Sequence, residues 1–134
     1  MRKSILTVIS LILAFGVCSG CAFKKLSGLP AEDQAVEYSV MMISAYNATY
    51  HQFNAIKPTL DDEQRKKAKP FVQAMNIARP SVVLLGKSAE AWKTAADSQN
   101  STKAEAARIV YRDQKVIFAE IWTKALELWA KIKE

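Results

Sequence analysis

The chain has 134 residues, of which 50% are hydrophobic, and it contains only four glycines and four prolines. This length fits one domain with a hydrophobic core, and the composition favours helix and excludes a low-complexity chain. The 19 Lys and Arg residues exceed the 13 Asp and Glu residues, which gives a formal net charge of +6.

Residues 1–20 have the pattern of an export signal. Arg2 and Lys3 form a short positive start, Ile5 to Val17 is almost unbroken apolar sequence, and small residues follow it. The apolar run has about 13 residues, which is shorter than the ~20 needed to cross a bilayer as a helix. We therefore interpret residues 1–20 as a signal peptide that is removed during export.

The end of this signal, Ser19-Gly20-Cys21, resembles the lipobox of bacterial lipoproteins, in which the cysteine becomes the lipid-modified first residue of the mature chain. Only the signal and Cys21 carry the resemblance, and Cys18 stands where the family usually has leucine or another aliphatic residue. The resemblance implies lipidation at Cys21 and location in the bacterial cell envelope. Ala22 after the cysteine is similar to the outer-membrane type, which implies a protein facing the periplasm. An ordinary signal cleaved after Ala22 and an uncleaved anchor are the alternatives.

We interpret residues 21–30 as a lipidated linker between the membrane and the folded domain. Without Arg2 and Lys3, the 19 basic residues fall to 17 against 13 acids, a formal charge of about +4. Lys24 and Lys25 would lie near anionic lipid head groups, unless the linker is a solvated spacer. Cys21 would be the only cysteine left, which excludes a disulfide framework.

The first helix is predicted over residues 31–56. Apolar side chains recur there at steps of three and four, as on one face of a helix, at Val36, Val40, Ile43, Tyr46, Tyr50 and Phe53. Asn47 falls inside this stripe, where a buried amide would need hydrogen-bond partners. Pro58 ends the helix because proline has no N–H to donate.

The second helix is predicted from Thr59 to about Ala96. Thr59 followed by Asp62 is a start similar to a capping box. Two prolines, Pro70 and Pro80, fall inside the segment. The apolar spacing nevertheless continues across both in one phase, at Ala68, Phe71, Met75, Ala78, Val82, Leu85, Ala89, Trp92 and Ala96. We therefore expect one long helix that is bent at one or both prolines.

The third helix is predicted from Ser101 or Thr102, after a turn at residues 97–100, and Thr102 with Glu105 forms a capping-box pattern. Its seam contains Ala104, Ala107, Tyr111, Gln114, Phe118, Ile121, Ala125, Leu128 and Ile132. The seam is flanked by further apolar residues, Val110, Ile117, Trp122 and Trp129. Such a broad apolar face is typical of a helix packed against two neighbours.

These segments predict an all-α fold, an antiparallel up-down-up three-helix bundle with a proline-kinked middle helix, over residues 31–134. No segment alternates with the period of a strand, and the connections are short, as neighbouring antiparallel helices require. We expect Leu85 and Ile121 to be buried in the bundle.

Basic residues are the first candidates for an interaction site: Lys24, Lys25, Arg65, Lys66, Lys67 and Lys69. Basic clusters attract phosphate-bearing partners, most often nucleic acid. Export argues against nucleic acid, which leaves anionic lipid or an acidic protein. A solvated helix face is the alternative for residues 65–69.

Tryptophans are the second candidates, because Trp92, Trp122 and Trp129 could line a pocket for a small apolar ligand. All three lie on or beside the predicted seams, where aromatic residues normally fill a core.

A catalytic or metal site is not predicted. His51 is the only histidine, and no second histidine or thiolate is available to act with it. Asp61 to Glu63 lack the ligand spacing and the glycine of a calcium loop. Cys18 and Cys21 form a C-x-x-C pair, but at the end of a signal rather than inside a folded domain. We therefore predict no enzyme activity, metal or cofactor.

Together these patterns predict a small, non-catalytic, membrane-anchored lipoprotein that contacts another envelope protein. The alternative is a periplasmic binding module for a small apolar ligand.

Overall fold

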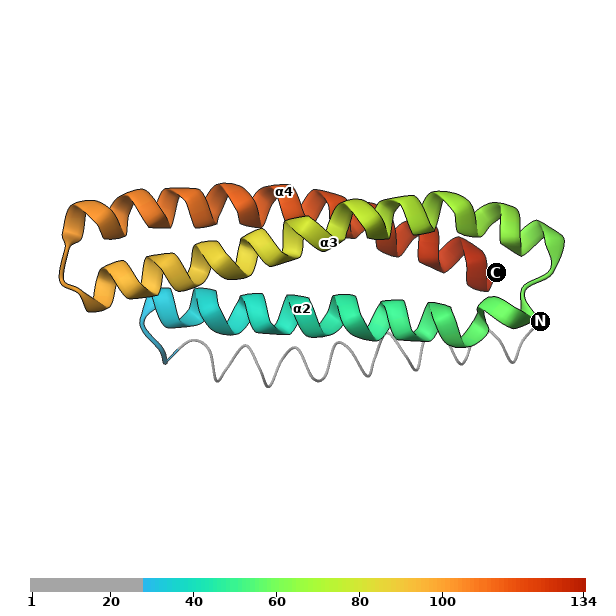
Figure 1. Ribbon diagram of the computed structural model, residues 1–134, viewed down its shortest axis with the longest axis horizontal. Coiled ribbons are helices and arrows are strands. Elements are labelled where there is room, and N and C mark those ends of the chain that lie inside the picture. Colours follow the sequence, from blue (N-terminus) through green and yellow to red (C-terminus); the bar gives the residue numbers. More distant parts are fainter. Residues whose placement is uncertain (1–27) are drawn as a thin grey trace.

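The computed structural model describes residues 28–134, and this part of the chain is helical and contains no strand. It contains three long helices, α2 (Ala31–Ile56), α3 (Asp62–Asp97) and α4 (Ser101–Lys133), with a 3-10 turn, η1 (Lys57–Thr59), between the first two. Figure 1 shows the three helices side by side in an elongated bundle. The prediction of an all-helical bundle is confirmed for this part of the chain. The predicted signal peptide, and the linker up to residue 27, lie outside the described residues.

A continuous hydrophobic core lies between the helices, and α3 supplies much of it. Its buried apolar residues are Ala74 and seven of the nine residues of the predicted stripe: Ala68, Phe71, Met75, Ala78, Val82, Leu85 and Ala89. The other two, Trp92 and Ala96, are only partly buried. Leu85 is 0% exposed, as predicted. At Gly86, where α3 faces α2, an added Cβ would lie 3.4 Å from Cδ1 of Ile43, which is an ordinary van der Waals contact, so the packing does not require glycine here.

Pro70 and Pro80 both lie inside α3, which continues through them without a break, as predicted. A helical proline lacks one N–H and crowds the carbonyl four residues earlier, which here belongs to Lys66 or Asn76. Both prolines and both of these residues are on the exposed side of the helix. Water can therefore bond to the freed carbonyls, while the buried face on the other side remains uninterrupted.

The buried face of α2 differs from the predicted one. The buried residues are Ala35, Ser39, Tyr46, Thr49 and Phe53. The predicted stripe is wrong at Val40 and Tyr50, which are 53% and 45% exposed, and Asn47 is exposed as well. The Ser39 hydroxyl donates to the carbonyl of Ala35 at 2.6 Å, so a small polar side chain enters the core with its hydrogen bond made. Small residues allow close helix approach, which a pattern based on large apolar side chains does not detect.

The start of α3 also differs from the prediction. Thr59 belongs to η1, and its hydroxyl donates to the carbonyl of Ile56 at 2.7 Å instead of capping α3. The capping box uses Asp61 and Gln64: the Asp61 carboxylate accepts from the Gln64 N–H at 2.8 Å, and the Gln64 side chain accepts from the Asp61 N–H at 3.2 Å. This pair is better suited than Thr59 with Asp62, because the motif prefers Glu or Gln at its fourth position.

Helix α4 begins at Ser101, one of the two predicted starts, and Asn100 caps it by accepting from the Lys103 N–H at 3.0 Å. The predicted capping pair is wrong, because Glu105 instead accepts two hydrogen bonds from Arg108, at 2.8 and 2.6 Å. Asparagine is as good an N-cap as threonine, and it immediately precedes the first helical residue.

The buried face of α4 lies closer to its two C-terminal tryptophans than the predicted seam does. Trp122 and Trp129 are 9% and 6% exposed, whereas Ile121 is only partly buried, against our prediction. A tryptophan removes more apolar surface from water than an isoleucine does, so the packing that buries the two indoles is favoured.

Candidate functional site

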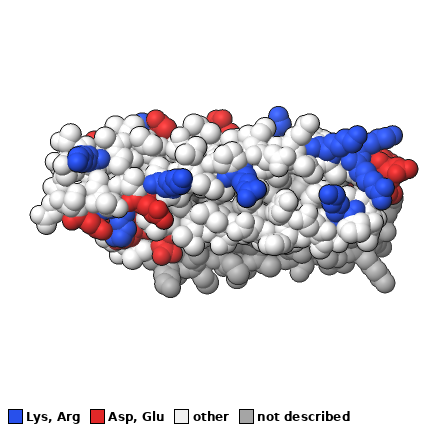
Figure 2. All heavy atoms as spheres, in the orientation of Figure 1, with Lys and Arg blue, Asp and Glu red and all other residues white. Residues whose placement is uncertain are grey.

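The four predicted basic residues of α3 lie at the end of α2 opposite to the predicted tether. Helix α2 has 26 residues, and at 1.5 Å per residue its two ends are about 39 Å apart. Figure 2 shows Lys and Arg side chains gathered at this end, over the first turns of α3. We call η1 with the first turns of α3 the distal end. Lys24 and Lys25 lie outside the described residues.

Only part of this basic cluster faces a concave surface. Arg65 and Lys69 line a pocket, whereas Lys66 and Lys67 are not among its lining residues. Lys67 instead forms an ion pair of 3.6 Å with Glu63, one turn earlier in the same helix. Lys57 of η1, which the sequence analysis did not select, lines the pocket with Arg65 and Lys69.

This distal pocket lies where α2, η1 and α3 meet, and its volume is about 390 Å³. Apolar residues form its inner part: Phe53, Leu60 and Ala68 are 4%, 6% and 6% exposed. The three cations are exposed around it. Among residues 28–134, no Asp or Glu lines the pocket and none of the three cations belongs to an ion pair. The pocket therefore combines an apolar interior with an excess of positive charge.

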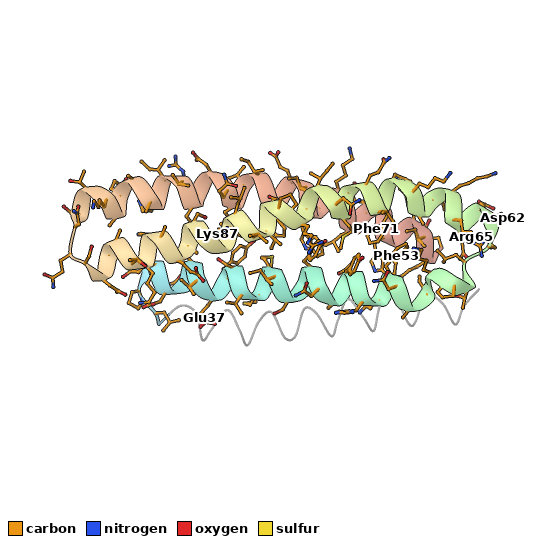
Figure 3. All side chains as sticks on the ribbon, in the orientation of Figure 1. Glu37, Phe53, Asp62, Arg65, Phe71 and Lys87 are labelled. Carbon is orange, nitrogen blue, oxygen red and sulfur yellow. The ribbon has the colours of Figure 1, made fainter. Side chains whose placement is uncertain are left out.

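The inner wall of the distal pocket is part of the aromatic core. The ring of Phe53 lies 5.0 Å from that of Phe71 and 6.1 Å from that of Trp129, between ring centroids. Figure 3 shows Phe53 and Phe71 directed toward each other between the helices, with Arg65 nearer the distal end. Close packing holds Phe53 in place, so the pocket is formed without a ligand.

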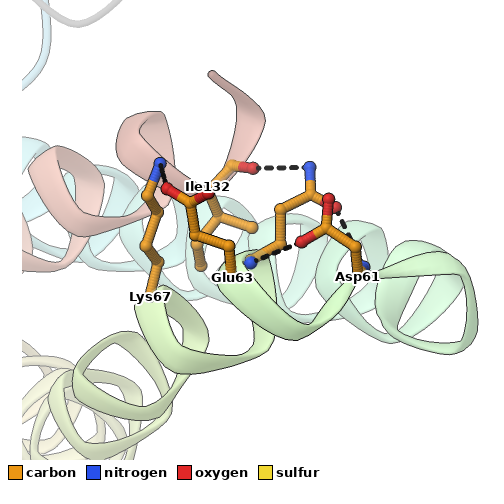
Figure 4. Close-up of polar contacts among 5 residues, drawn as sticks. Asp61, Glu63, Lys67 and Ile132 are labelled. Carbon is orange, nitrogen blue, oxygen red and sulfur yellow. Dashed lines mark hydrogen bonds and ion pairs between the residues drawn. The ribbon is translucent and has the colours of Figure 1, made fainter.

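A polar network fixes the start of α3 and therefore the positions of Arg65 and Lys69. Gln64 of the capping box also donates from its Nε2 to the carbonyl of Ile132 in the last turn of α4, at 3.3 Å (Figure 4). One side chain thus caps α3 and connects it to the end of α4.

The tryptophans lie in or against the core. The Trp122 ring packs on Phe118 at 5.9 Å, and the Trp129 ring packs on Phe71 at 5.2 Å. Trp92 is only half-buried, with its ring 5.6 Å from that of Tyr111. None of the three tryptophans lines the distal pocket, and a ligand-binding role for them stays a prediction.

His51 lies exposed on α2. Asp61 caps α3, while Asp62 and Glu63 lie in its first turn, where negative charge is favourable. Among the residues that the structure describes, no group of three or more His, Cys, Asp or Glu side chains is placed to hold a metal ion.

One sequence signal could have located the distal pocket. Leu60 is a lone apolar residue immediately before the N-cap, the position of a hydrophobic staple, which packs against the residue four places into the helix. That residue is Arg65. The pattern indicates that Leu60 is buried beside the stem of Arg65, with a charged group close to an apolar surface.

No protein-family model, curated protein or solved structure matches this chain. Between residues 28 and 134, no helix is both long enough and apolar enough to span a bilayer. The function is therefore proposed from the residues and their geometry.

Proposed function

We propose that this protein is a small, non-catalytic lipoprotein of the bacterial cell envelope, anchored by lipid at Cys21, whose helical bundle contacts another envelope protein. The export signal ending in Ser19-Gly20-Cys21 is the observation that carries the proposal. Residues 1–20 are then the signal peptide, 21–30 the linker and 31–134 the bundle. The start of α2 at Ala31 supports the last of these boundaries.

The envelope location makes a weak contact sufficient. Each buried methylene of an acyl chain adds about 0.8 kcal/mol of membrane attachment, and several chains together hold a protein durably. Tethering raises the local concentration of the bundle near membrane-bound partners, so the contact itself need not be strong. We place the protein at the outer membrane, facing the periplasm, because Ala22 follows the cysteine.

Two measurements test this proposal. Mass spectrometry of the protein extracted from membranes is expected to show a chain that begins at acylated Cys21. Cross-linking in intact envelopes followed by purification of the bundle is expected to recover one predominant envelope protein. An unmodified chain that begins after Ala22 and is soluble in the periplasm would contradict the lipid anchor.

We further infer that the bundle has an antiparallel up-down-up course and that α3 bends at its prolines. Lys93, near the end of α3, forms an ion pair of 2.7 Å with Asp33 near the start of α2. Gln64 at the start of α3 binds the carbonyl of Ile132 near the end of α4. Both contacts join the start of one helix to the end of another, which supports the antiparallel course.

Spin-label distances would test this arrangement. Glu37, Lys66 and Glu90 are all exposed, so labels there leave the core intact. Labels at 37 and 90 are expected to be close together, and labels at 37 and 66 far apart. The reverse order would contradict the antiparallel course.

A second candidate function is binding of a small apolar ligand in the periplasm. The half-buried ring of Trp92 favours it, because part of this indole remains accessible beside Tyr111. Titration with small aromatic compounds is then expected to quench tryptophan fluorescence to a saturating, stoichiometric end point. Quenching that grows linearly without saturation would contradict this candidate.

A further inference from the structure

We propose that the distal pocket binds a single-chain anionic amphiphile, with its apolar chain against Phe53, Leu60 and Ala68 and its carboxylate or phosphate head group among Lys57, Arg65 and Lys69. This site goes beyond the proposed envelope role, and it requires neither a protein partner nor the lipid at Cys21.

The apolar side of the site is preformed. Phe53 is held by ring contacts with Phe71 and Trp129, and Leu60 is held at the start of α3 beside the capping box. Small-molecule sites are typically concave, mostly apolar and formed before the ligand arrives, with a few polar groups that fix its orientation. The distal pocket has these properties, and an alkyl chain that enters it loses contact with water.

The charges around the pocket select an anion. Lys57, Arg65 and Lys69 come from η1 and from two successive turns of α3, and no acidic side chain of the described part of the chain lines the pocket beside them. The guanidinium of Arg65 offers the planar pair of donors that matches a carboxylate or a phosphate. A cationic or neutral amphiphile would leave this excess positive charge uncompensated.

The size of the pocket favours a ligand with a single alkyl chain. A volume of about 390 Å³ lies near the lower end of the ~300–1,000 Å³ of small-molecule sites. The pocket is separated from the start of α2 by the length of that helix, about 39 Å.

The chain contains a matched control for this proposal. Lys66 and Lys67 have the same charge and lie between Arg65 and Lys69 in sequence, but they do not line the pocket. Arg65→Gln with Lys69→Gln, and Lys66→Gln with Lys67→Gln, therefore remove the same charge from the same turns of α3. All of these side chains lie outside the core, and circular dichroism is expected to show unchanged helix content for both double variants.

The experiment uses the chain as it is isolated from the cell, reconstituted in phosphatidylcholine nanodiscs if it is recovered with membranes and kept in buffer if it is soluble. Three photoactivatable probes carry the same 12-carbon chain with a diazirine, and they end in a carboxylate, a phosphate or a trimethylammonium group. After irradiation, mass spectrometry maps the labelled residues. We expect the anionic probes to label Phe53, Leu60 and Ala68, and the cationic probe not to do so. The stronger of the two anionic probes identifies the head group.

Labelling at these positions is expected to fall about fivefold or more in the Arg65→Gln/Lys69→Gln variant, because two favourable charge contacts are lost. The Lys66→Gln/Lys67→Gln variant should be labelled like the unmodified chain. Equal loss in both variants, equal labelling by the cationic probe, or adducts spread along the bundle would each overturn the proposal. These readouts are independent of whether Cys21 is acylated or a protein partner is found.

Discussion

Leu84 and Leu85 are consecutive residues of α3 with opposite environments, because Leu84 is 50% exposed and Leu85 is 0% exposed. Leu85→Ala should lower the free energy of unfolding by about 2–5 kcal/mol, since it leaves a cavity in a closed core. Leu84→Ala, the matched control, should change it by less than about 0.5 kcal/mol. Urea unfolding followed by circular dichroism measures both. A loss below about 1 kcal/mol for Leu85→Ala would show that the core is placed wrongly.

Tyr111 predicts how stability depends on alkaline pH. Its burial, and to a smaller extent the nearby Tyr38, raises the pKa of the Tyr111 hydroxyl to about 12. In the unfolded chain a tyrosine ionises near pH 10, so above this pH the unfolded state loses its proton first. The contribution of Tyr111 is therefore complete below about pH 10 and declines as the pH rises toward 12. Burial also raises the pKa values of Tyr38 and Tyr46, which adds to the decline.

Thermal melting at pH 9 and pH 11.5 measures this decline, which Tyr111→Phe is expected to reduce. If Tyr111→Phe melts with the same pH dependence as the unmodified chain, ionisation at this position does not limit alkaline stability.

The burial of large apolar residues in α3 could be predicted from the sequence, whereas the burial of small polar residues in α2 could not. Phe71, Met75 and Leu85 recur at helical spacing, and each is at most 1% exposed. Ser39 is 2% exposed because its hydroxyl bonds to its own helix, a contact that hydrophobicity does not reveal. A hydrophobic pattern therefore identifies the correct helix but places the buried face of α2 incorrectly.

At the level of the helices, the capping box of α3 gives a direct test of where the helix begins. Asp61→Ala removes the carboxylate that accepts from the Gln64 N–H, and should cost about 0.5–2 kcal/mol of stability. Thr59→Ala should cost less, because the Thr59 hydroxyl donates to the carbonyl of Ile56 at the end of α2 and does not cap α3. Chemical unfolding of both variants measures the difference. A larger loss of unfolding free energy for Thr59→Ala than for Asp61→Ala would indicate that Thr59 caps α3.

Helix continuity could be predicted more reliably than helix starts. The spacing of buried residues in α3 keeps one phase past Pro70 and Pro80, and this long-range pattern indicated one helix. A start depends on a single hydrogen bond, and Thr59, Asp61 and Asp62 all have side chains that can supply it. Because η1 includes Thr59, the helix starts after Asp61, and the residue types alone do not reveal that this turn forms.

At the level of the whole molecule, we expect location to matter more than chemistry. Cys21→Ser, exported behind a different cleavable signal, should retain the fold but lose function in cells, because the bundle is no longer concentrated at the membrane. His51→Ala should retain function, since this side chain is exposed on α2. Complementation of a deletion strain by each variant is the measurement. Full rescue by the untethered form would contradict the role of the anchor.

The candidate site could be predicted only in part. Arg65 and Lys69 were selected from the sequence for their charge, but the sequence does not distinguish them from Lys66 and Lys67, which lie off the pocket. Lys57 was missed because its proximity to the others depends on how the chain turns at η1. A linear pattern records the density of charge, whereas a pocket depends on the direction of each side chain.

The ion pairs of Lys93 make the resistance of the bundle to a pulling force depend on salt. The ammonium group of Lys93 lies 2.7 Å from Asp33 in the first turn of α2 and 3.2 Å from Asp97 at the end of α3, and hydrogen bonds to these carboxylates, to Asp33 most of all, raise the pKa of Lys93. A pulling force applied through the residues before Ala31 reaches the bundle beside Asp33. The ion pair between Asp33 and Lys93 therefore bears the load before the aromatic core does. Partly exposed ion pairs are weak, and salt weakens them further. The force at which α2 begins to peel from its neighbours should therefore fall as the ionic strength rises, while the force needed to separate the distal end stays nearly constant.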